Sequence, residues 1–278
     1  MRACVTRQEE KKGILMSALL FFDIDGTLIT LDEQHRMPES TKEALLQAKA
    51  NGHKIFINTG RVKTAIDRNL RSFAFDGMVC GCGTYIEYEG QELFHASLPK
   101  ATCKQYADLL HEMRYQTVFE GKDRLFIDGD YGEGGFMEYI YDYFSKNVEL
   151  PIGTIDDPEL VYDKFTTSQM SDSDVERFQK VFSNVCNLIP HGSQVIEAVP
   201  LGHSKATGIQ QVMDHFGASL SDCYAFGDSI NDMEMLQYVP HSVGMGNAVP
   251  EVLEVVEYVT TDVTEDGIAN ALKHYHLI

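Results

Sequence analysis

The sequence has no apolar run that approaches the roughly 20 residues of a membrane-spanning helix. Residues 1–15 do not combine an apolar segment with a small-residue cleavage site, so they do not read as a signal peptide. Basic residues are scarce. The chain has 23 Lys and Arg and 42 Asp and Glu, which gives a net charge of −19. An acidic surface gains nothing by releasing the counterions of nucleic acid or of an anionic membrane. We therefore expect neither as a partner.

The cysteines also lack the paired spacing of metal ligands, and several of them lie in apolar stretches. The six are Cys4, Cys80, Cys82, Cys103, Cys186 and Cys223. This pattern predicts reduced, structural thiols in a cytoplasmic protein. The pair in Cys80-Gly81-Cys82 could bind a soft metal ion, but such a site needs a second pair, which the sequence does not supply.

The composition is that of a soluble globular protein, with 44% hydrophobic and 23% charged residues. At 278 residues the chain is long enough for one large domain or two ordinary ones. Residues 1–15 are polar and aperiodic, and Met16 shortly precedes the first apolar strand. We predict that 1–15 are a disordered or non-native leader and that Met16 is the natural start, the alternative being an ordinary frayed terminus. A monomer or small homo-oligomer is expected.

The stretch LLFFDIDGTL at 19–28 is the predicted centre of the fold. Four apolar residues that end in an acid indicate a buried strand, which carries Asp23 to the edge of a sheet. Alternate side chains of a strand point to opposite faces, so Asp25 shares a site with Asp23 only if the chain leaves strand geometry at Ile24. Gly26 permits that departure. Alone, the pattern fits a strand ending in an Asp-Gly turn equally well.

Further motifs follow in order along the chain. Thr59-Gly60-Arg61 and the segment GDSIND at 227–232 each follow an apolar, strand-like run, and Lys205 lies between them. A helix is expected from about 38 to 51, a strand at 54–60, a helix over about 62–72 and a strand at 77–80. This alternation predicts a parallel sheet with right-handed crossovers. In such sheets ligands collect at the carboxyl ends of the strands, where Asp23 and Thr59 fall.

This ordered set of motifs resembles the haloacid dehalogenase superfamily of phosphotransferases. The large gap before Lys205 resembles its Cof-type branch, with a class IIB cap, whose members are mostly magnesium-dependent phosphatases of sugar phosphates and cofactor phosphates. The resemblance covers the chain from about residue 18 onward. It implies an α/β fold, with a Rossmann-like parallel-sheet core and an inserted α+β cap domain.

The change of sequence pattern at residue 84 fits this division. Residues 84–95 alternate apolar and polar side chains around a Glu-Gly turn and read as a hairpin. We assign 84–190 to an α+β cap that sets substrate specificity, and 16–83 with 191–278 to the catalytic core. A strand at 194–200 is expected to return the chain to the core.

Two neighbouring carboxylates suit phosphate ester hydrolysis, because one can attack phosphorus while the other moves protons. We expect Asp23 to be the nucleophile and Asp25 the general acid and base. An all-oxygen site of this kind suits Mg²⁺. The resemblance places the carboxylate of Asp23, the backbone carbonyl of Asp25 and Asp228 on the metal, with Asp232 beside them. The alternative for Asp228 and Asp232 is helix capping.

Four residues are expected to contact phosphate. Thr59 and the amide of Gly60 would hold phosphate oxygens at a helix start. Lys205 would neutralise the transferring group, although a lone lysine is usually a solvated surface residue. Asn231 would lie beside the metal and the phosphate. Arg61 either contacts substrate or pairs with an acid.

The predicted function is magnesium-dependent hydrolysis of a small phosphorylated metabolite, a sugar phosphate or cofactor phosphate, through an aspartyl phosphate. The alternatives are a phosphomutase of the same fold, or a binding or regulatory protein that keeps the fold without catalysis. Two departures from the family pattern stand out. Gly81-Cys82-Gly83 replaces the common Asn-Gly-Ala, which removes an amide that can touch substrate, and Asn58 replaces a small residue.

Overall fold

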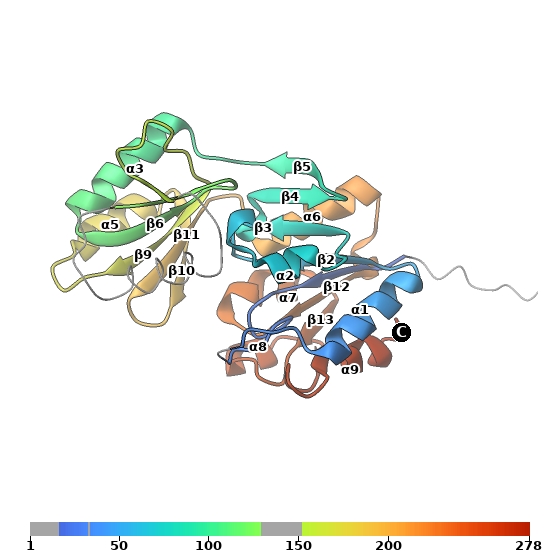
Figure 1. The fold of residues 1–278 in the computed structure, drawn as a ribbon. Helices are drawn as coiled ribbons and strands as arrows, with labels where there is room; N and C mark the ends of the chain where they lie inside the picture. The colour runs from blue at the N-terminus through green and yellow to red at the C-terminus, as the bar shows by residue number, and fades with distance from the viewer. Residues whose placement is uncertain (1–16, 33, 129–151) are drawn as a thin grey trace, which may run out of the picture.

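The computed structural model describes residues 17–32, 34–128 and 152–278. The predicted leader and Met16 lie outside these ranges. Two sheets, each covered by helices, form two lobes of the described chain (Figure 1). No helix in these ranges is both long and apolar enough to span a bilayer.

The larger lobe contains an eight-stranded sheet. In order across the sheet the strands are β14 (Tyr258–Val259), β13 (His241–Gly244), β12 (Cys223–Gly227), β1 (Leu19–Phe22), β2 (Lys54–Asn58), β3 (Gly77–Cys80), β4 (Tyr85–Tyr88) and β5 (Gln91–His95). The strands from β14 to β3 run parallel, whereas β4 and β5 are antiparallel additions at one edge. The predicted parallel-sheet core of an α/β fold is confirmed.

Both faces of this sheet are buried under helices, which explains why β1 is apolar throughout. Leu20 and Phe22 pack on one side, and Leu19 and Phe21 on the other. Burying each Phe contributes roughly 2 kcal/mol to folding. The helices are α1 (Glu39–Ala50) and α9 (Gly267–His274) on the first face, and α6 (Lys205–Phe216), α7 (Met233–Tyr238) and α8 (Pro250–Leu253) on the second.

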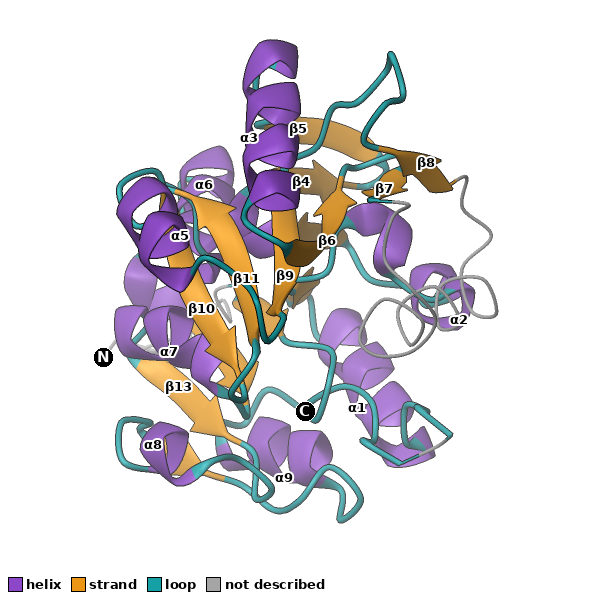
Figure 2. Cartoon of the chain, turned by 90° about the vertical axis from the view of Figure 1, so that its left-hand side faces the viewer, coloured by secondary structure: helices purple, strands orange, loops and turns teal. Residues whose placement is uncertain are grey.

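The smaller lobe, called the cap below, contains a six-stranded sheet with helices on one face (Figure 2). In order the strands are β10 (Cys186–His191), β11 (Val195–Pro200), β9 (Lys164–Gln169), β6 (Tyr115–Glu120), β7 (Leu125–Ile127) and β8 (Ile152–Thr154). The helices α3 (Lys100–Glu112) and α5 (Val175–Phe182) pack on the sheet through buried aromatic and aliphatic side chains. The predicted inserted α+β layer is therefore present.

The predicted boundaries of the insertion are wrong at both ends. The hairpin predicted at 84–95 does form, but β4 pairs with β3 and so extends the core sheet. The strand at 194–200 was expected in the core, but β11 pairs with β9 and β10 in the cap. The chain therefore leaves the core sheet after β5 and returns to it after β11. Alternating patterns specify a strand, but they do not specify which of two sheets it joins.

The predicted helix over 62–72 is also wrong in part. The segment contains a short 3₁₀ helix, η1 (Lys63–Ala65), and a separate short helix, α2 (Arg68–Ser72). Ile66 and Asp67 between them have extended ψ angles of 128° and 146°. Because those angles interrupt the helical hydrogen-bond series, the two pieces cannot form one continuous helix.

Candidate active site

A tight loop after β1 turns Asp23 and Asp25 toward one end of the sheet. The amide of Asp23 still donates to the carbonyl of Phe226, 3.0 Å away, and so keeps its place beside β12. The carbonyl of Ile24 then accepts the amides of residues 27, 28 and 29 at 2.9–3.3 Å. Gly26 has a φ of +77°, and a Cβ there would lie 2.3 Å from Asp228 Oδ2. The loop therefore requires glycine at this position, as the sequence suggested.

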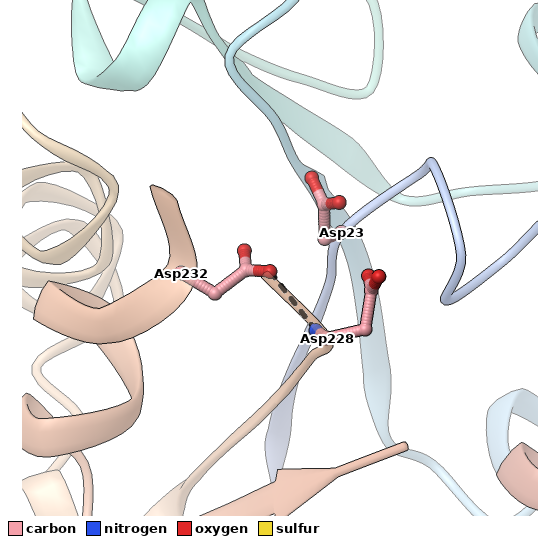
Figure 3. Close-up of side chains that lie close together, drawn as sticks. All are labelled: Asp23, Asp228 and Asp232. Carbon is pink, nitrogen blue, oxygen red and sulfur yellow. Dashed lines mark hydrogen bonds between the residues drawn. The ribbon is translucent and has the colours of Figure 1, made fainter. Parts of the chain in front are cut away.

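Three buried carboxylates meet at this end of the sheet. Asp23 follows β1, Asp228 follows β12, and Asp232 lies one turn further on (Figure 3). One oxygen from each lies within 4.8 Å of the others, and the residues are 3%, 6% and 0% exposed respectively. Among the described residues this is the group of side chains arranged to hold a metal ion, and Cys80 and Cys82 are not part of it.

Lys205 is the cation of this cluster. It begins α6, is 1% exposed, and places its Nζ 2.6 Å from Asp23 Oδ1 and 2.6 Å from Asp232 Oδ1. The Asn231 side-chain oxygen lies 3.4 Å from the same Nζ. The alternative of a solvated surface lysine is therefore wrong. Burial opposes the charge of Lys205, but the carboxylates of Asp23 and Asp232 raise its pKa above the ordinary value and keep it protonated.

Asp232 makes the capping contacts that the sequence offered as the alternative to a metal role, and it also contacts Lys205. Its Oδ2 accepts the backbone amides of Asp228 and Ser229 at 3.0 and 3.1 Å, which is a capping arrangement. Its Oδ1 faces Lys205. One carboxylate oxygen is therefore engaged with the Lys205 ammonium and the other with two backbone amides. The side chain fixes the loop that carries Asp228 and orients the lysine.

Burial and crowding make two of the carboxyl groups hard to ionise. Burial raises the pKa of Asp23 well above its ordinary value, Lys205 lowers it, and neighbouring acids raise it further. Burial raises the pKa of Asp228 to about 7, with a further contribution from the charge of Asp232. A hydrogen bond from Thr27 Oγ1 to Asp228 Oδ1, 3.0 Å long, works against this rise. A site of this kind favours a bound cation, which would relieve the repulsion.

Asp25 lies at the rim and is paired with Arg61. Its two oxygens accept Arg61 Nε at 2.9 Å and Nη2 at 2.6 Å. Arg61 also approaches Asp67, at 3.5 Å. Of the two alternatives for Arg61, pairing with an acid is therefore observed. The Asp25 side chain is 42% exposed, and its carboxylate is not among the three that cluster.

Thr59 and Gly60 lie at the carboxyl end of β2, as predicted, but not at a helix start. The next helical residue is Lys63, so Gly60 is in a turn. Thr59 is 1% exposed, its amide donates to Val79, and its hydroxyl accepts the amide of Arg61 at 3.1 Å. The turn is therefore fixed by its own hydrogen bonds rather than by a helix.

The two departures from the family pattern have structural explanations. Asn58 donates to the carbonyl of Lys205 at 3.1 Å and so ties β2 to the start of α6. Residues 81–83 have φ angles of +57°, +52° and +84°. The backbone of Cys82 therefore has a left-handed conformation, which usually favours glycine. Its thiol points to Glu197 of the cap, with Sγ 3.6 Å from Oε1.

A cavity of about 570 Å³ joins this end of the core sheet to the cap. From the core it is lined by Asp23, Asp25, Thr59, Gly60, Arg61, Asp228, Asn231 and Asn247, and from the cap by Glu120, Lys164, Thr166, His191 and Glu197, among others. The sequence motifs contain neither Asn247 nor the cap residues. Asn247 donates to the carbonyl of Gly26 at 2.8 Å and accepts the amide of Val263 at 2.9 Å, so it supports the loop after β1.

The raised pKa of Asp228 leads to a prediction for the metal-free protein. In the unfolded chain this carboxyl titrates near 3.8, whereas in the folded chain it titrates near 7. The folded state thus holds the proton more tightly, so the free energy of unfolding in chelator should fall as the pH rises from 4 through 7. Asp228→Asn removes this ionisation. We expect it to stabilise the metal-free protein at pH 8 by on the order of 3 kcal/mol.

Urea unfolding at pH 5 and pH 8 in chelator measures this effect. The gain from Asp228→Asn should be largest at pH 8 and small at pH 5. Asp123, whose side chain is 80% exposed, provides the matched control Asp123→Asn, for which no pH-dependent gain is expected. Equal effects of the two variants on stability at pH 8 would contradict the claim that burial raises the pKa of Asp228.

Comparisons of the sequence and of the structure with known proteins identify the same family. The chain matches the family of haloacid dehalogenase-like hydrolases over residues 20–272. The YkrA protein of Bacillus subtilis (strain 168) is 31% identical over 278 residues, which cover 94% of this chain and 99% of YkrA. The 5-amino-6-(5-phospho-D-ribitylamino)uracil phosphatase YitU of the same organism is 27% identical, with 92% and 97% covered. The solved structure of the HAD subclass IIB sugar phosphatase BT4131 gives a TM-score of 0.79 at 29% identity, with 94% of this chain and 100% of that chain covered.

Proposed function

Because the chain belongs to the haloacid dehalogenase-like hydrolases and is a phosphatase of their Cof type, we propose that it hydrolyses a small phosphorylated metabolite through phosphoryl transfer to Asp23. The observation that carries this proposal is the buried contact between Lys205 Nζ and Asp23 Oδ1, which is 2.6 Å long. Asp23 itself lines the cavity between the core sheet and the cap. A buried carboxylate held by a cation at the end of a strand is oriented for attack and cannot rotate away.

The proposed reaction has two steps. In the first, a carboxylate oxygen of Asp23 bonds to phosphorus while the bond from phosphorus to the leaving oxygen breaks. Asp25, released from Arg61 and protonated, gives its proton to that oxygen and becomes a carboxylate. In the second, water attacks phosphorus, Asp25 takes a proton from the water, and the acyl phosphate bond breaks to restore Asp23. Asp25 lines the cavity at its rim, which suits contact with a leaving group.

Lys205 stabilises the charge that develops in both steps. Its ammonium is buried, permanently charged and already positioned, so little reorganisation is needed when the phosphoryl group arrives. Thr59, Gly60 and Asn231 line the same cavity and supply the polar groups for phosphate oxygens. A phosphomutase would use the same first step but would return the phosphoryl group to substrate, so release of inorganic phosphate distinguishes the two reactions.

The carboxylate cluster fits Mg²⁺, a hard ion that prefers oxygen ligands. Asp23 and Asp228 would hold it with the backbone carbonyl of Asp25. Asp232 would orient the site, since both its oxygens are already engaged. When bound, the ion supplies positive charge that offsets the phosphoryl oxygens and the two carboxylates.

Hydrolysis of para-nitrophenyl phosphate tests this function. We expect chelation with EDTA to lower the rate by on the order of 10²-fold or more, and Mg²⁺ to restore it. Ca²⁺ should restore little, because it prefers longer bonds and more ligands than a compact octahedral site offers. Full activity in excess EDTA, with no metal detected by elemental analysis, would contradict the proposed magnesium dependence.

A further inference from the structure

Four side chains on one face of the cap sheet form what we call the cap wall: Glu120, Lys164, Thr166 and Glu197. Strand geometry explains how they come together. In β6, β9 and β11 these residues alternate with buried apolar ones, such as Phe119, that pack under the cap helices. The pairings of Glu120 with Lys164 and of Glu197 with Thr166 bring the four side chains to neighbouring positions on the face away from the helices.

The charged side chains of the cap wall form ion pairs with one another. Lys164 Nζ lies 2.7 Å from Glu120 Oε1 and 2.9 Å from Glu197 Oε1, and these side chains are only 3%, 8% and 5% exposed. Thr166 donates to Glu120 Oε1 at 2.7 Å, and His191 Nε2 lies 2.9 Å from Glu197 Oε2. One ammonium therefore serves two carboxylates. Within the four residues of the cap wall, the single ammonium is thus already paired with both carboxylates.

The cap wall faces the reaction site across a short gap. Its four residues line the same cavity as Asp23 and Asp25. Glu197 reaches the turn that precedes Arg61, since a Cβ added to Gly60 would lie 2.9 Å from its Oε1. The wall therefore lines the space that is open to the organic group of a phosphate ester bound at Asp23.

We propose that the cap wall is a specificity determinant that accepts leaving groups rich in hydroxyls and rejects those that carry a second anionic group. This inference rests on the proposed function. Carboxylates accept hydrogen bonds from hydroxyl groups, whereas a second carboxylate or phosphate would lose its hydration beside two acids whose cation is already engaged. Specific sites discriminate by repelling the wrong ligand as well as by contacting the right one.

Two open-chain phosphates that differ only at C1 test this directly. Glucitol 6-phosphate has a hydroxymethyl group there and 6-phosphogluconate has a carboxylate. We expect kcat/KM to be higher for glucitol 6-phosphate by on the order of tenfold or more. Equal or reversed values, including no measurable hydrolysis of glucitol 6-phosphate by protein that hydrolyses para-nitrophenyl phosphate, would overturn the inference. Absence of magnesium-dependent para-nitrophenyl phosphate hydrolysis would instead contradict the proposed function.

Removing one negative charge from the cap wall should reduce the preference for glucitol 6-phosphate over 6-phosphogluconate. In Glu120→Gln we expect the ratio of kcat/KM values to shift toward 6-phosphogluconate by on the order of tenfold, because one carboxylate no longer opposes the second anion. Glu120→Asp keeps the charge and should keep the wild-type preference. Glu159→Gln, at a cap side chain that is 82% exposed, is the control and should leave the ratio unchanged. An unchanged ratio in folded Glu120→Gln protein would overturn the inference, and the wild-type ratio decides if this variant does not fold.

Discussion

Replacing Asp23 with asparagine is expected to reduce turnover by on the order of 10⁵-fold while leaving the fold intact. The amide is nearly the same size as the carboxylate but cannot form the acyl phosphate. Burial and neighbouring acids raise the pKa of Asp23, so losing its charge should not lower the free energy of unfolding at pH 8. Initial rates of phosphate release, together with urea unfolding, measure both effects.

The exposed Asp123 again provides the control. Asp123→Asn should retain wild-type turnover, because its side chain is 80% exposed. Activity of Asp23→Asn within tenfold of the wild type would exclude the covalent route through this residue. A large loss of stability together with the loss of activity would mean that Asp23 is needed for folding rather than for the reaction alone.

Replacing Lys205 with methionine is expected to lower turnover by on the order of 10³- to 10⁴-fold. Methionine preserves much of the buried volume and removes the ammonium that lies 2.6 Å from both Asp23 and Asp232. The metal-free protein should also lose about 3–5 kcal/mol of stability, because the partner carboxylates remain buried without a cation.

A second substitution separates these two effects of Lys205. Adding Asp232→Asn to Lys205→Met removes one of the stranded charges, so part of the stability should return while activity stays low. Lys180→Met, on an exposed position of α5, is the control and should change neither quantity. Near-normal turnover in Lys205→Met would show that the buried ammonium has a structural role only.

The core of the site was predictable from sequence because its motifs are local and its geometry follows from the sheet. Asp23, Thr59 and Asp228 each follow an apolar strand, and parallel strands end at the same edge. Burial of Lys205 was not predictable from its own neighbours. It depends on contacts with Asp23 and Asp232, which are 182 and 27 residues away in the sequence.

The limits of the cap were predicted less well, since strand pairing is a long-range property. Residues in β4 alternate in the way of any hairpin, yet they pair with β3 and complete the core sheet. Those in β11 were expected in the core and pair with β9 instead. In both cases the local pattern is satisfied by either sheet, and tertiary packing decides.

The charged residues of the cap wall are recognisable in the sequence by their positions in the strands. Glu120 is the last residue of β6, Lys164 is the first residue of β9, and Glu197 lies within β11. Charged residues in buried strands rarely lack partners, which indicates that they pair with one another. Their position opposite Asp23 could not have been inferred, because it depends on how the cap is placed over the core.

Direct trapping of phosphorylated Asp23 is the most direct test of the proposed reaction. Wild-type protein mixed with para-nitrophenyl phosphate and Mg²⁺, quenched in acid within the first turnovers and digested, would be analysed by peptide mass spectrometry. We predict that a phosphoryl group is found on Asp23 in the peptide that contains β1, and that the Asp23→Asn protein gives none. A phosphoryl group on another residue, or no phosphorylated peptide while phosphate is being released in a burst, would contradict the account.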